Sequence, residues 1–149
     1  MDIWKPSVTV AAVIERDGRF LLVEEEADGR RVFNQPAGHW DPGETLVEAC
    51  AREALEETAH PFTPLQVMGV YRWHHAPSNT SFLRFAFCGT LGEADPARQL
   101  DREIIRAVWL SAAEVRELQP RHRSPLVMRC VDDYLAGRRF PLDLLTHLD

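Results

Sequence analysis

Cysteine is scarce in this chain of 149 residues, and the few cysteines present are not arranged for cross-linking. Cys50, Cys88 and Cys130 are odd in number, lie far apart and form no Cys-x-x-Cys pair. Disulfide frameworks and structural zinc sites need cysteines that are paired at regular spacings. We therefore expect reduced, buried thiols in a cytoplasmic protein, without a disulfide framework or a zinc site.

Long hydrophobic runs are also missing. The apolar run at residues 8–14 is much shorter than the roughly 20 residues of a membrane-spanning helix. Asp2 precedes this run, whereas a secretory signal would place basic residues there. We expect neither a signal peptide nor a membrane partner.

A surplus of positive charge is the third absence. Lysine and arginine number 17 against 23 acidic residues, which gives a formal net charge of −6 and a pI near 5.5. Proteins that bind nucleic acids stably normally present a basic face, so we expect no nucleic-acid partner. A small phosphate-rich ligand would need a metal ion and local arginines to overcome the acidic field.

The chain length fits one domain, spanning residues 1–149, with a core of its own. Apolar segments flank the turn Asp17–Gly18, and this pattern predicts a hairpin between residues 8–14 and 20–23. Further predicted strands cover residues 32–33, 65–73, 81–91 and 104–110.

Helix signals lie before and after the later strands. Two pairs have the spacing of a capping box: Thr45 with Glu48, and Ser111 with Glu114. Ser124 and Pro125 begin a last predicted helix over residues 126–135, and Gly137 ends it. Strands mixed with helices in this order predict an α/β (α+β) fold.

Three carboxylates follow the first capping box. Glu53, Glu56 and Glu57 share one side of a helix, and apolar residues gather on roughly the opposite side. Like charges at this spacing repel by a few tenths of a kcal/mol per pair, and Arg52 alone cannot neutralise three of them. A solvated acidic face is one interpretation. The other is a Mg²⁺ or Mn²⁺ site, because hard cations prefer oxygen ligands.

The segment before this helix favours the second interpretation. Residues 34–45 contain two prolines and two glycines, which predicts a structured loop. A rigid loop that leads into an acidic helix can direct a backbone carbonyl to a metal and N–H groups to phosphate oxygens.

Loop and helix together resemble the signature of the Nudix hydrolases, which cleave nucleoside diphosphates linked to another moiety and related organic diphosphates. The matching positions are Gly38, Glu44 and the run Arg52-Glu53-Ala54-Leu55-Glu56-Glu57. The resemblance implies an α/β/α sandwich with a mixed sheet between helices. The match departs at Ala59-His60, where the family usually has glycine and an apolar residue, so the end of the helix is the part left in question.

What the resemblance implies for the site follows the signature position by position. Glu53, Glu56 and Glu57, with the carbonyl of Ala37, would bind Mg²⁺, with Mn²⁺ as the alternative. Arg52 would orient Glu56, as residues behind metal ligands often do. Glu44 is expected to brace the junction of loop and helix.

The general base has two candidates, Glu53 and Glu103. Some members of the family carry a glutamate at the position of Glu103, before a strand tryptophan that would here be Trp109. A carboxylate that binds the metal has a lowered pKa and accepts a proton less well, which favours Glu103. The other interpretation of Glu103 is an exposed acid at the start of a strand.

Residues outside the signature must select the substrate. Trp73 and Phe82, on two facing strands, are candidates to stack on a heteroaromatic ring, and Arg84 and Arg123 to bind a phosphate. Each of these four side chains, taken singly, also fits an ordinary core or surface position.

Four stretches resemble a phosphatase branch of the family, the NudJ type. They are Lys5-Pro6 with Val8-Thr9-Val10-Ala11, Asn34 to His39, Phe82-Leu83-Arg84-Phe85, and Arg123-Ser124-Pro125-Leu126. That branch implies release of orthophosphate from nucleoside di- and triphosphates or from diphosphates of thiamine or its hydroxymethylpyrimidine precursor.

Other functions remain open at the level of the sequence. A pyrophosphohydrolase would attack an internal phosphorus, a non-catalytic binding module would lose signature carboxylates, and an isoprenoid diphosphate isomerase would need a reactive cysteine. The expected partner is a small nucleotide or organic diphosphate. The protein is expected to be a monomer or a homodimer.

Overall fold

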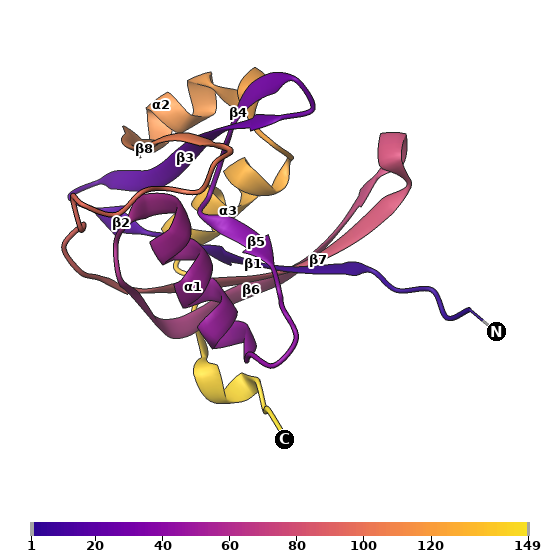
Figure 1. Cartoon of the computed structure of the whole chain (residues 1–149). Coiled ribbons are helices and arrows are strands. Elements are labelled where there is room, and N and C mark those ends of the chain that lie inside the picture. Colours follow the sequence, from indigo (N-terminus) through magenta and orange to yellow (C-terminus); the bar gives the residue numbers. More distant parts are fainter. Residues whose placement is uncertain (1, 149) are drawn as a thin grey trace.

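The computed structural model describes residues 2–148, which build two β-sheets and three α-helices (Figure 1). The strands are β1 (Ser7–Ala12), β2 (Glu15–Arg16), β3 (Arg19–Ala27), β4 (Arg30–Asn34), β5 (Ala37–His39), β6 (Phe62–His75), β7 (Thr80–Leu91), β8 (Ile104–Ser111) and β9 (Phe140–Pro141). The helices are α1 (Leu46–Thr58), α2 (Ala112–Glu117) and α3 (Leu126–Leu135), with short 3₁₀ turns η1 (Ala76–Ser78), η2 (Gln119–Arg121) and η3 (Leu142–Leu144).

The first sheet is mixed, in the order β5-β1-β7-β6-β9. Strands β1 and β7 run parallel, and the other neighbours are antiparallel. Helix α1 packs on β1, β5 and β6, and α3 packs on β6. Their contacts fall in two separate cores, one on each face of the sheet, with Val67 and Phe87 in the first and Met68 and Ala86 in the second. The predicted α/β (α+β) class and the mixed sheet between helices are confirmed.

A second, antiparallel sheet lies beside the first. Strand β3 is at its centre, between β4 and β8, and β2 continues it through the tight turn Asp17–Gly18. Both turn residues have positive φ. The hairpin predicted between residues 8–14 and 20–23 is therefore only partly right, because β1 leaves for the first sheet. Residues 10–14 are buried on both faces, which is typical of a central strand rather than of a half-exposed hairpin arm.

Helix α1 begins as its sequence predicts. Thr45 accepts a hydrogen bond from the N–H of Glu48, and the Glu48 side chain accepts one from the N–H of Thr45. The helix ends at Ala59, which takes a left-handed conformation with φ 63° and donates its N–H to Leu55. A residue with a Cβ resists this conformation by about 1 kcal/mol. The helix therefore ends where the family has glycine, although this chain has alanine there.

The two later helices also match their signals. Ser111 and Glu114 form the capping box of α2, and α3 covers the predicted residues 126–135. The three cysteines are free and buried. None of the helices described within residues 2–148 has the length and apolar character needed to cross a membrane.

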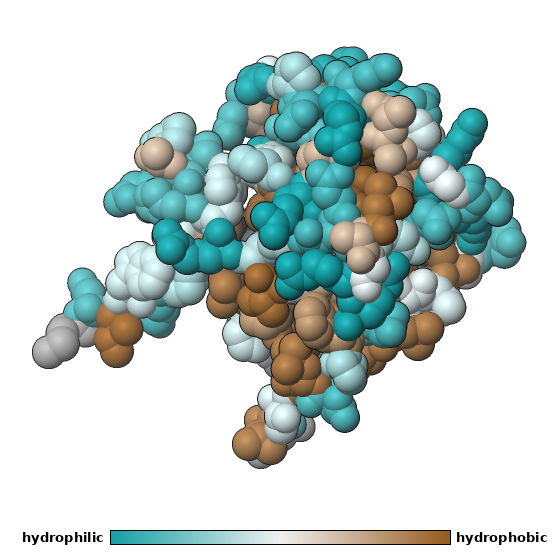
Figure 2. Space-filling model, turned by 180° about the vertical axis from the view of Figure 1, so that it is seen from behind, coloured by the Kyte–Doolittle hydropathy of each residue, from teal (hydrophilic) through white to brown (hydrophobic). Residues whose placement is uncertain are grey.

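The two ends of the chain extend away from the body of the molecule. Figure 1 shows them leaving in different directions, and Figure 2 shows the same ends from behind. Both carry exposed hydrophobic side chains, namely Ile3 and Trp4 near one end and Leu144 and Leu148 near the other. The hairpin of β6 and β7 also projects from the body, ending in η1.

Candidate active site

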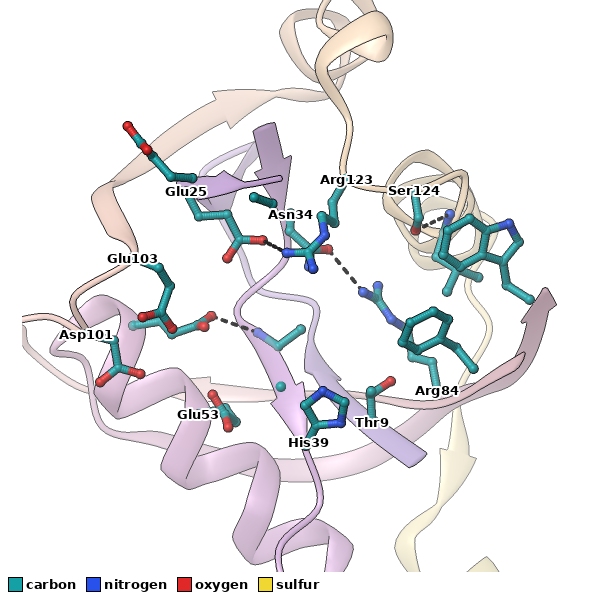
Figure 3. A pocket seen from close by; sticks show the side chains of 18 of the residues that line it. Thr9, Glu25, Asn34, His39, Glu53, Arg84, Asp101, Glu103, Arg123 and Ser124 are labelled. Atoms are coloured by element: carbon teal, nitrogen blue, oxygen red, sulfur yellow. Dashed lines mark hydrogen bonds and ion pairs between the residues drawn. The ribbon is translucent and has the colours of Figure 1, made fainter. Parts of the chain in front are cut away.

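A cleft of about 520 Å³ lies where β5, α1, β3 and β7 come together. Figure 3 shows carboxylates of Glu53, Asp101 and Glu103 at one end and Arg84 and Ser124 at the other. The predicted site residues in its lining are Ala37, Gly38, Glu53, Glu57, Trp73, Phe82, Arg84, Glu103 and Arg123. Segments that are distant in the sequence thus meet in one cleft.

Strand β5 brings the loop against helix α1. Residues 34–45 were predicted as a structured loop, and residues 37–39 instead form this short strand, paired with β1. A Cβ on Gly38 would lie 2.2 Å from the Cδ atom of Glu53. A larger residue here would force the Glu53 carboxylate to move, so glycine keeps that carboxylate in its place beside the strand, which accounts for the residue at this position of the signature.

The same strand fixes Glu57. The backbone N–H of Ala37 donates to Oε1 of Glu57 over 2.9 Å. Glu53 and Glu57 are both buried, so they lie on the packed side of α1 and not on a solvated face. The sequence interpretation of a solvated acidic face is therefore wrong for these two residues, because β5 covers them.

Arg52 links the carboxylates of the signature. Its guanidinium donates to both oxygens of Glu44, over 2.7 and 3.0 Å. It also donates to Glu53 over 2.8 Å and to Glu56 over 3.3 Å. Glu44 in turn accepts the backbone N–H of Asp41 over 2.9 Å. Arg52 thus ties the loop before α1 to two carboxylates on the helix.

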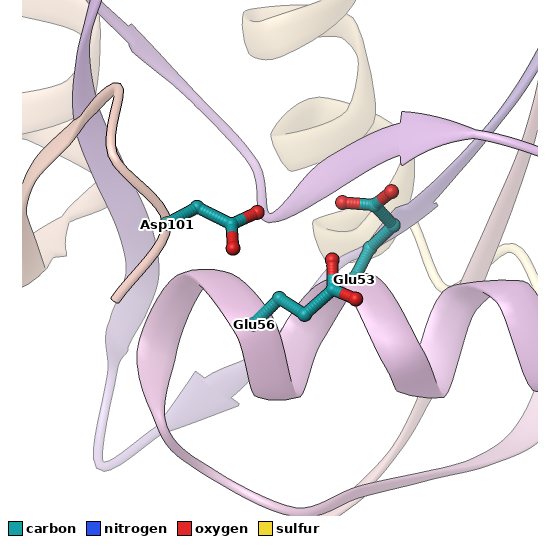
Figure 4. A group of neighbouring side chains, drawn as sticks. All are labelled: Glu53, Glu56 and Asp101. Carbon is teal, nitrogen blue, oxygen red and sulfur yellow. The ribbon is translucent and has the colours of Figure 1, made fainter. Parts of the chain in front are cut away.

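Two groups of three carboxylates each lie close enough to share a cation. Oxygen atoms of Glu53, Glu56 and Asp101 lie within 4.8 Å of one another, and so do those of Glu57, Asp101 and Glu103. Figure 4 shows the first group, where side chains from α1 and from the segment before β8 face a common space. Asp101 belongs to both groups.

Sequence reasoning missed Asp101. The residue stands in a polar segment without periodicity, two positions before Glu103. Its backbone N–H donates to the carbonyl of Glu56 over 3.1 Å, and this hydrogen bond holds the segment before β8 against α1. Its nearness to Glu103 in the sequence was the one available signal.

Burial shifts the pKa values of the carboxylates at this end of the cleft. Burial raises the pKa of Glu57 to about 9 and that of Glu53 to about 7, from an ordinary value of 4.5. Burial and the neighbouring Glu56 and Glu103 also raise the pKa of Asp101. In contrast, the bonds from Arg52 lower the pKa of Glu44.

This end of the cleft therefore holds buried carboxyl groups whose ionised form is not sufficiently stabilised by Arg52. The donor atoms are all carboxylate oxygens, which hard divalent cations prefer. The residues fit a site for such a cation, whose charge would restore ionisation of the buried carboxylates.

The other end of the cleft carries aromatic rings and arginines. The rings of Trp73 and Phe82 stack with centroids 5.5 Å apart and an interplanar angle of 19°. Arg84 is buried and donates to two neutral side-chain oxygens, those of Asn34 at the end of β4 and of Gln35 directly after it. Arg123 pairs with the buried Glu25 over 2.8 Å, at the wall of the cleft. Glu25 was not among the residues predicted for the site, because in the sequence it is one of three consecutive acidic residues, 24–26.

The two candidates for the general base differ in their surroundings. Glu53 is buried and bonded to Arg52, while Glu103 is exposed in the lining of the cleft. Both have an oxygen near Asp101. The geometry brings both carboxylates to the same end of the cleft.

Comparisons with known proteins agree with this geometry. A profile of the NUDIX domain matches residues 4–129. The chain belongs to the Nudix family. Phosphatase NudJ of Escherichia coli (strain K12) is 42% identical over 143 residues, which cover 96% of this chain and 92% of that protein. This Nudix protein is therefore an enzyme, a hydrolase of pyrophosphate bonds, and not a non-catalytic binding module.

Solved structures extend the comparison to the fold. A NUDIX hydrolase from Nitrosomonas europaea is 52% identical, covers 97% of this chain and 98% of its own, and superposes with a TM-score of 0.95. The E. coli ORF135 protein is 23% identical, covers 90% of this chain and 91% of its own, and superposes with a TM-score of 0.70. The second likeness concerns the fold alone.

Proposed function

We propose that this Nudix hydrolase removes orthophosphate from the end of a phosphoanhydride, with Mg²⁺ as cofactor and Mn²⁺ as the alternative. The substrates would be nucleoside di- and triphosphates or organic diphosphates such as those of thiamine and hydroxymethylpyrimidine. One observation carries the proposal: a single cleft joins a carboxylate cluster to stacked aromatic rings and arginines. The 42% identity to a protein named Phosphatase NudJ supports the choice of orthophosphate.

The carboxylate end would hold the metal. Glu53, Glu56 and Glu57 provide oxygens from α1, Asp101 adds one from the segment before β8, and the carbonyl of Ala37 is the fifth donor that we assign. When bound, the cation would neutralise phosphate oxygens and polarise an attacking water. Phosphoryl transfer requires little else of a protein than positioning and charge stabilisation.

The remaining residues orient these groups and the substrate. Arg52 holds the carboxylates of Glu53 and Glu56 in place, and Glu44 fixes Arg52 through two hydrogen bonds. Glu103 accepts the proton of the attacking water in our proposal, because it stands free of Arg52 at the edge of the cluster; Glu53 is the alternative.

At the opposite end, the rings of Trp73 and Phe82 would receive a heteroaromatic group, and Arg84 and Arg123 would bind phosphate oxygens. Residues 1–149 act as one domain in this proposal. The protein works on a small-molecule substrate in the cytoplasm, as a monomer or a homodimer.

Product identification tests the proposal. Purified protein with Mg²⁺ would be given nucleoside triphosphates, nucleoside diphosphates, ADP-ribose and thiamine diphosphate, and orthophosphate and pyrophosphate would be assayed separately. We expect orthophosphate from the di- and triphosphates, and its loss when a chelator removes the metal. Pyrophosphate from triphosphates, or cleavage of ADP-ribose alone, would contradict the proposal and identify a pyrophosphohydrolase.

A further inference from the structure

Arg84 is a buried cation with only neutral partners. The residue is 5% exposed, and its guanidinium donates to the side-chain oxygens of Gln35 over 2.9 Å and Asn34 over 3.0 Å. A longer contact of 3.7 Å joins it to the sulfur of Cys130. Among the ion pairs formed by residues 2–148, none includes Arg84. Burying a charge without a counter-ion is costly, so such a group is rarely kept without a purpose.

The neutral partners hold the guanidinium in a fixed place. Gln35 is itself anchored, since its amide group donates to the carbonyl of Val127 over 2.8 Å. The Nε atom of Arg84 is buried and has no hydrogen-bond partner within the described part of the chain. A guanidinium that is held rigidly in the lining of a cleft, without a carboxylate partner among the described residues, has the form of an anion-binding group.

The position of Arg84 along the sheet decides which anion it meets. Phe82 lies two residues away on β7, on the same face, with Trp73 opposite it on β6. On the other side, Arg84 pairs with Thr9 of β1, which pairs with His39 of β5, next to Gly38 and Glu53. Neighbouring strands lie about 4.8 Å apart, so the carboxylates begin about two strand spacings away. Arg84 therefore lies between the aromatic rings and the carboxylates.

We infer that Arg84 binds the proximal phosphate, the one that remains on the organic group, while the distal phosphate lies at the carboxylate end. This inference rests on the proposed function, in which the organic ring contacts Trp73 and Phe82 and the distal phosphate is released. One consequence concerns the products. When a diphosphate is cleaved, the monophosphate product retains the ring and the phosphate that Arg84 binds, whereas orthophosphate retains neither.

Inhibition by the two products tests the assignment. Arg84→Gln removes the charge, and Arg72→Gln makes the same change on an exposed residue of β6 outside the cleft lining. Adenosine monophosphate, thiamine monophosphate and orthophosphate would be measured with Mg²⁺, both as inhibitors of turnover and as ligands by calorimetry. In Arg84→Gln we expect the monophosphates to bind at least about tenfold more weakly, the effect of losing a charged hydrogen bond. The affinity of Arg84→Gln for orthophosphate should change by less than about twofold, and Arg72→Gln should bind all three ligands like the wild type.

A second variant separates binding from folding. Asn34→Asp keeps Arg84 and places a carboxylate where a neutral oxygen now lies 3.0 Å from its Nη2 atom. The new counter-ion would compete with the proximal phosphate, so we expect weaker monophosphate binding by a variant whose circular dichroism shows that it is folded. Unchanged monophosphate binding in both variants, or equal weakening for monophosphates and orthophosphate, would overturn the inference.

The calorimetric measurement involves no turnover, so it does not depend on which bond the enzyme cleaves. A wild type that released pyrophosphate would overturn the proposed function alone, and the monophosphate affinities would still report on Arg84.

Discussion

At the scale of single residues, the site combines buried acids with few compensating charges. Glu57 is the extreme case, because it is 3% exposed and, within residues 2–148, its carboxylate accepts one hydrogen bond, from the backbone N–H of Ala37. Burial raises its pKa to about 9, and Glu25 and Glu53 nearby add to the shift. A carboxylate in this state binds either a proton or, in the function that we propose, a cation.

We predict that Glu57→Gln abolishes activity and stabilises the metal-free protein at high pH. Loss of a residue behind a metal ligand costs about 10–100-fold, so loss of the ligand should lower kcat by more than about a hundredfold. The amide still accepts the N–H of Ala37 but cannot ionise. Wild-type turnover in this variant would show that the metal does not bind at Glu57.

The sign of the stability effect follows from the direction of the pKa shift. Because the folded-state pKa lies above the ordinary value of 4.5, folding is favoured while Glu57 is protonated. This stabilisation is complete below pH about 4.5 and is lost as the pH rises towards 9. Metal-free wild type should therefore be less stable than Glu57→Gln at pH 8, on the order of a few kcal/mol, and equal to it at pH 4.5. Urea unfolding in the presence of chelator measures the difference.

The sequence predicted the site residues unevenly for a physical reason. Glu53, Glu56 and Glu57 share a helix, and local helical geometry places them from their spacing alone. Asp101 reaches them only through the path of the segment before β8, which backbone hydrogen bonds to Glu56 and Ala59 set. Such bonds leave no trace in side-chain pattern.

At the scale of elements, α1 joins the fold to the chemistry. Its first turn is closed by the capping box of Thr45, and its later turns carry Glu53 and Glu57 into the cleft. Arg52, directly before Glu53, connects the helix to Glu44 in the loop. Helix start, loop and carboxylates therefore form one continuous unit.

We predict that Thr45→Ala destabilises the protein by about 1 kcal/mol, because the N–H of Glu48 loses its acceptor. The kcat measured well below the melting temperature should stay within about threefold of wild type, since the bonds of Arg52 still fix the acidic part of α1. Denaturant unfolding and steady-state kinetics provide the two readouts.

Thr45→Ser is the matched control, as it retains the hydroxyl and should retain the stability. A loss of turnover that exceeds the loss of stability would mean that the cap also sets the position of the carboxylates.

Elements were easier to predict than their pairing. Capping boxes and proline positions fixed the starts of α1, α2 and α3, because those signals are local. The partner of β1 was not predicted, since an apolar run buried on both faces carries no period-two pattern to specify its neighbour. Strand β5 was missed because it is three residues long and lies between prolines.

At the scale of the whole molecule, an acidic protein has to bind an anionic substrate. The formal net charge of −6 opposes a diphosphate at long range. Two features offset it within the cleft: the cation that we propose for the carboxylates, and the buried Arg84 with the Arg123 pair nearby. Without the cation, the cleft should repel its own substrate.

Metal binding should therefore stabilise the whole protein, and more strongly at high pH. At pH 5.5 the carboxyls of Glu53 and Glu57 are protonated in the metal-free protein, because burial raises their pKa values to about 7 and about 9. A cation must displace those protons, so its binding is weak at this pH. At pH 9 it instead relieves the repulsion between ionised carboxylates. At one fixed Mg²⁺ concentration, set to a hundred times the Kd at pH 9, we expect the melting temperature to rise on the order of 5–10 °C at pH 9, and much less at pH 5.5, where the Kd is higher.

Thermal melting with and without Mg²⁺ between pH 5.5 and 9 measures this linkage. Glu57→Gln should lose most of the rise in melting temperature that Mg²⁺ produces. Glu117→Gln, which removes an exposed acid on α2 outside the cleft lining, should keep this rise. A rise in melting temperature that is independent of pH, or that survives in Glu57→Gln, would place the cation elsewhere on the molecule. The pH dependence thus separates binding at the buried carboxylates from general screening of the negative surface, which salt alone would reproduce at either pH.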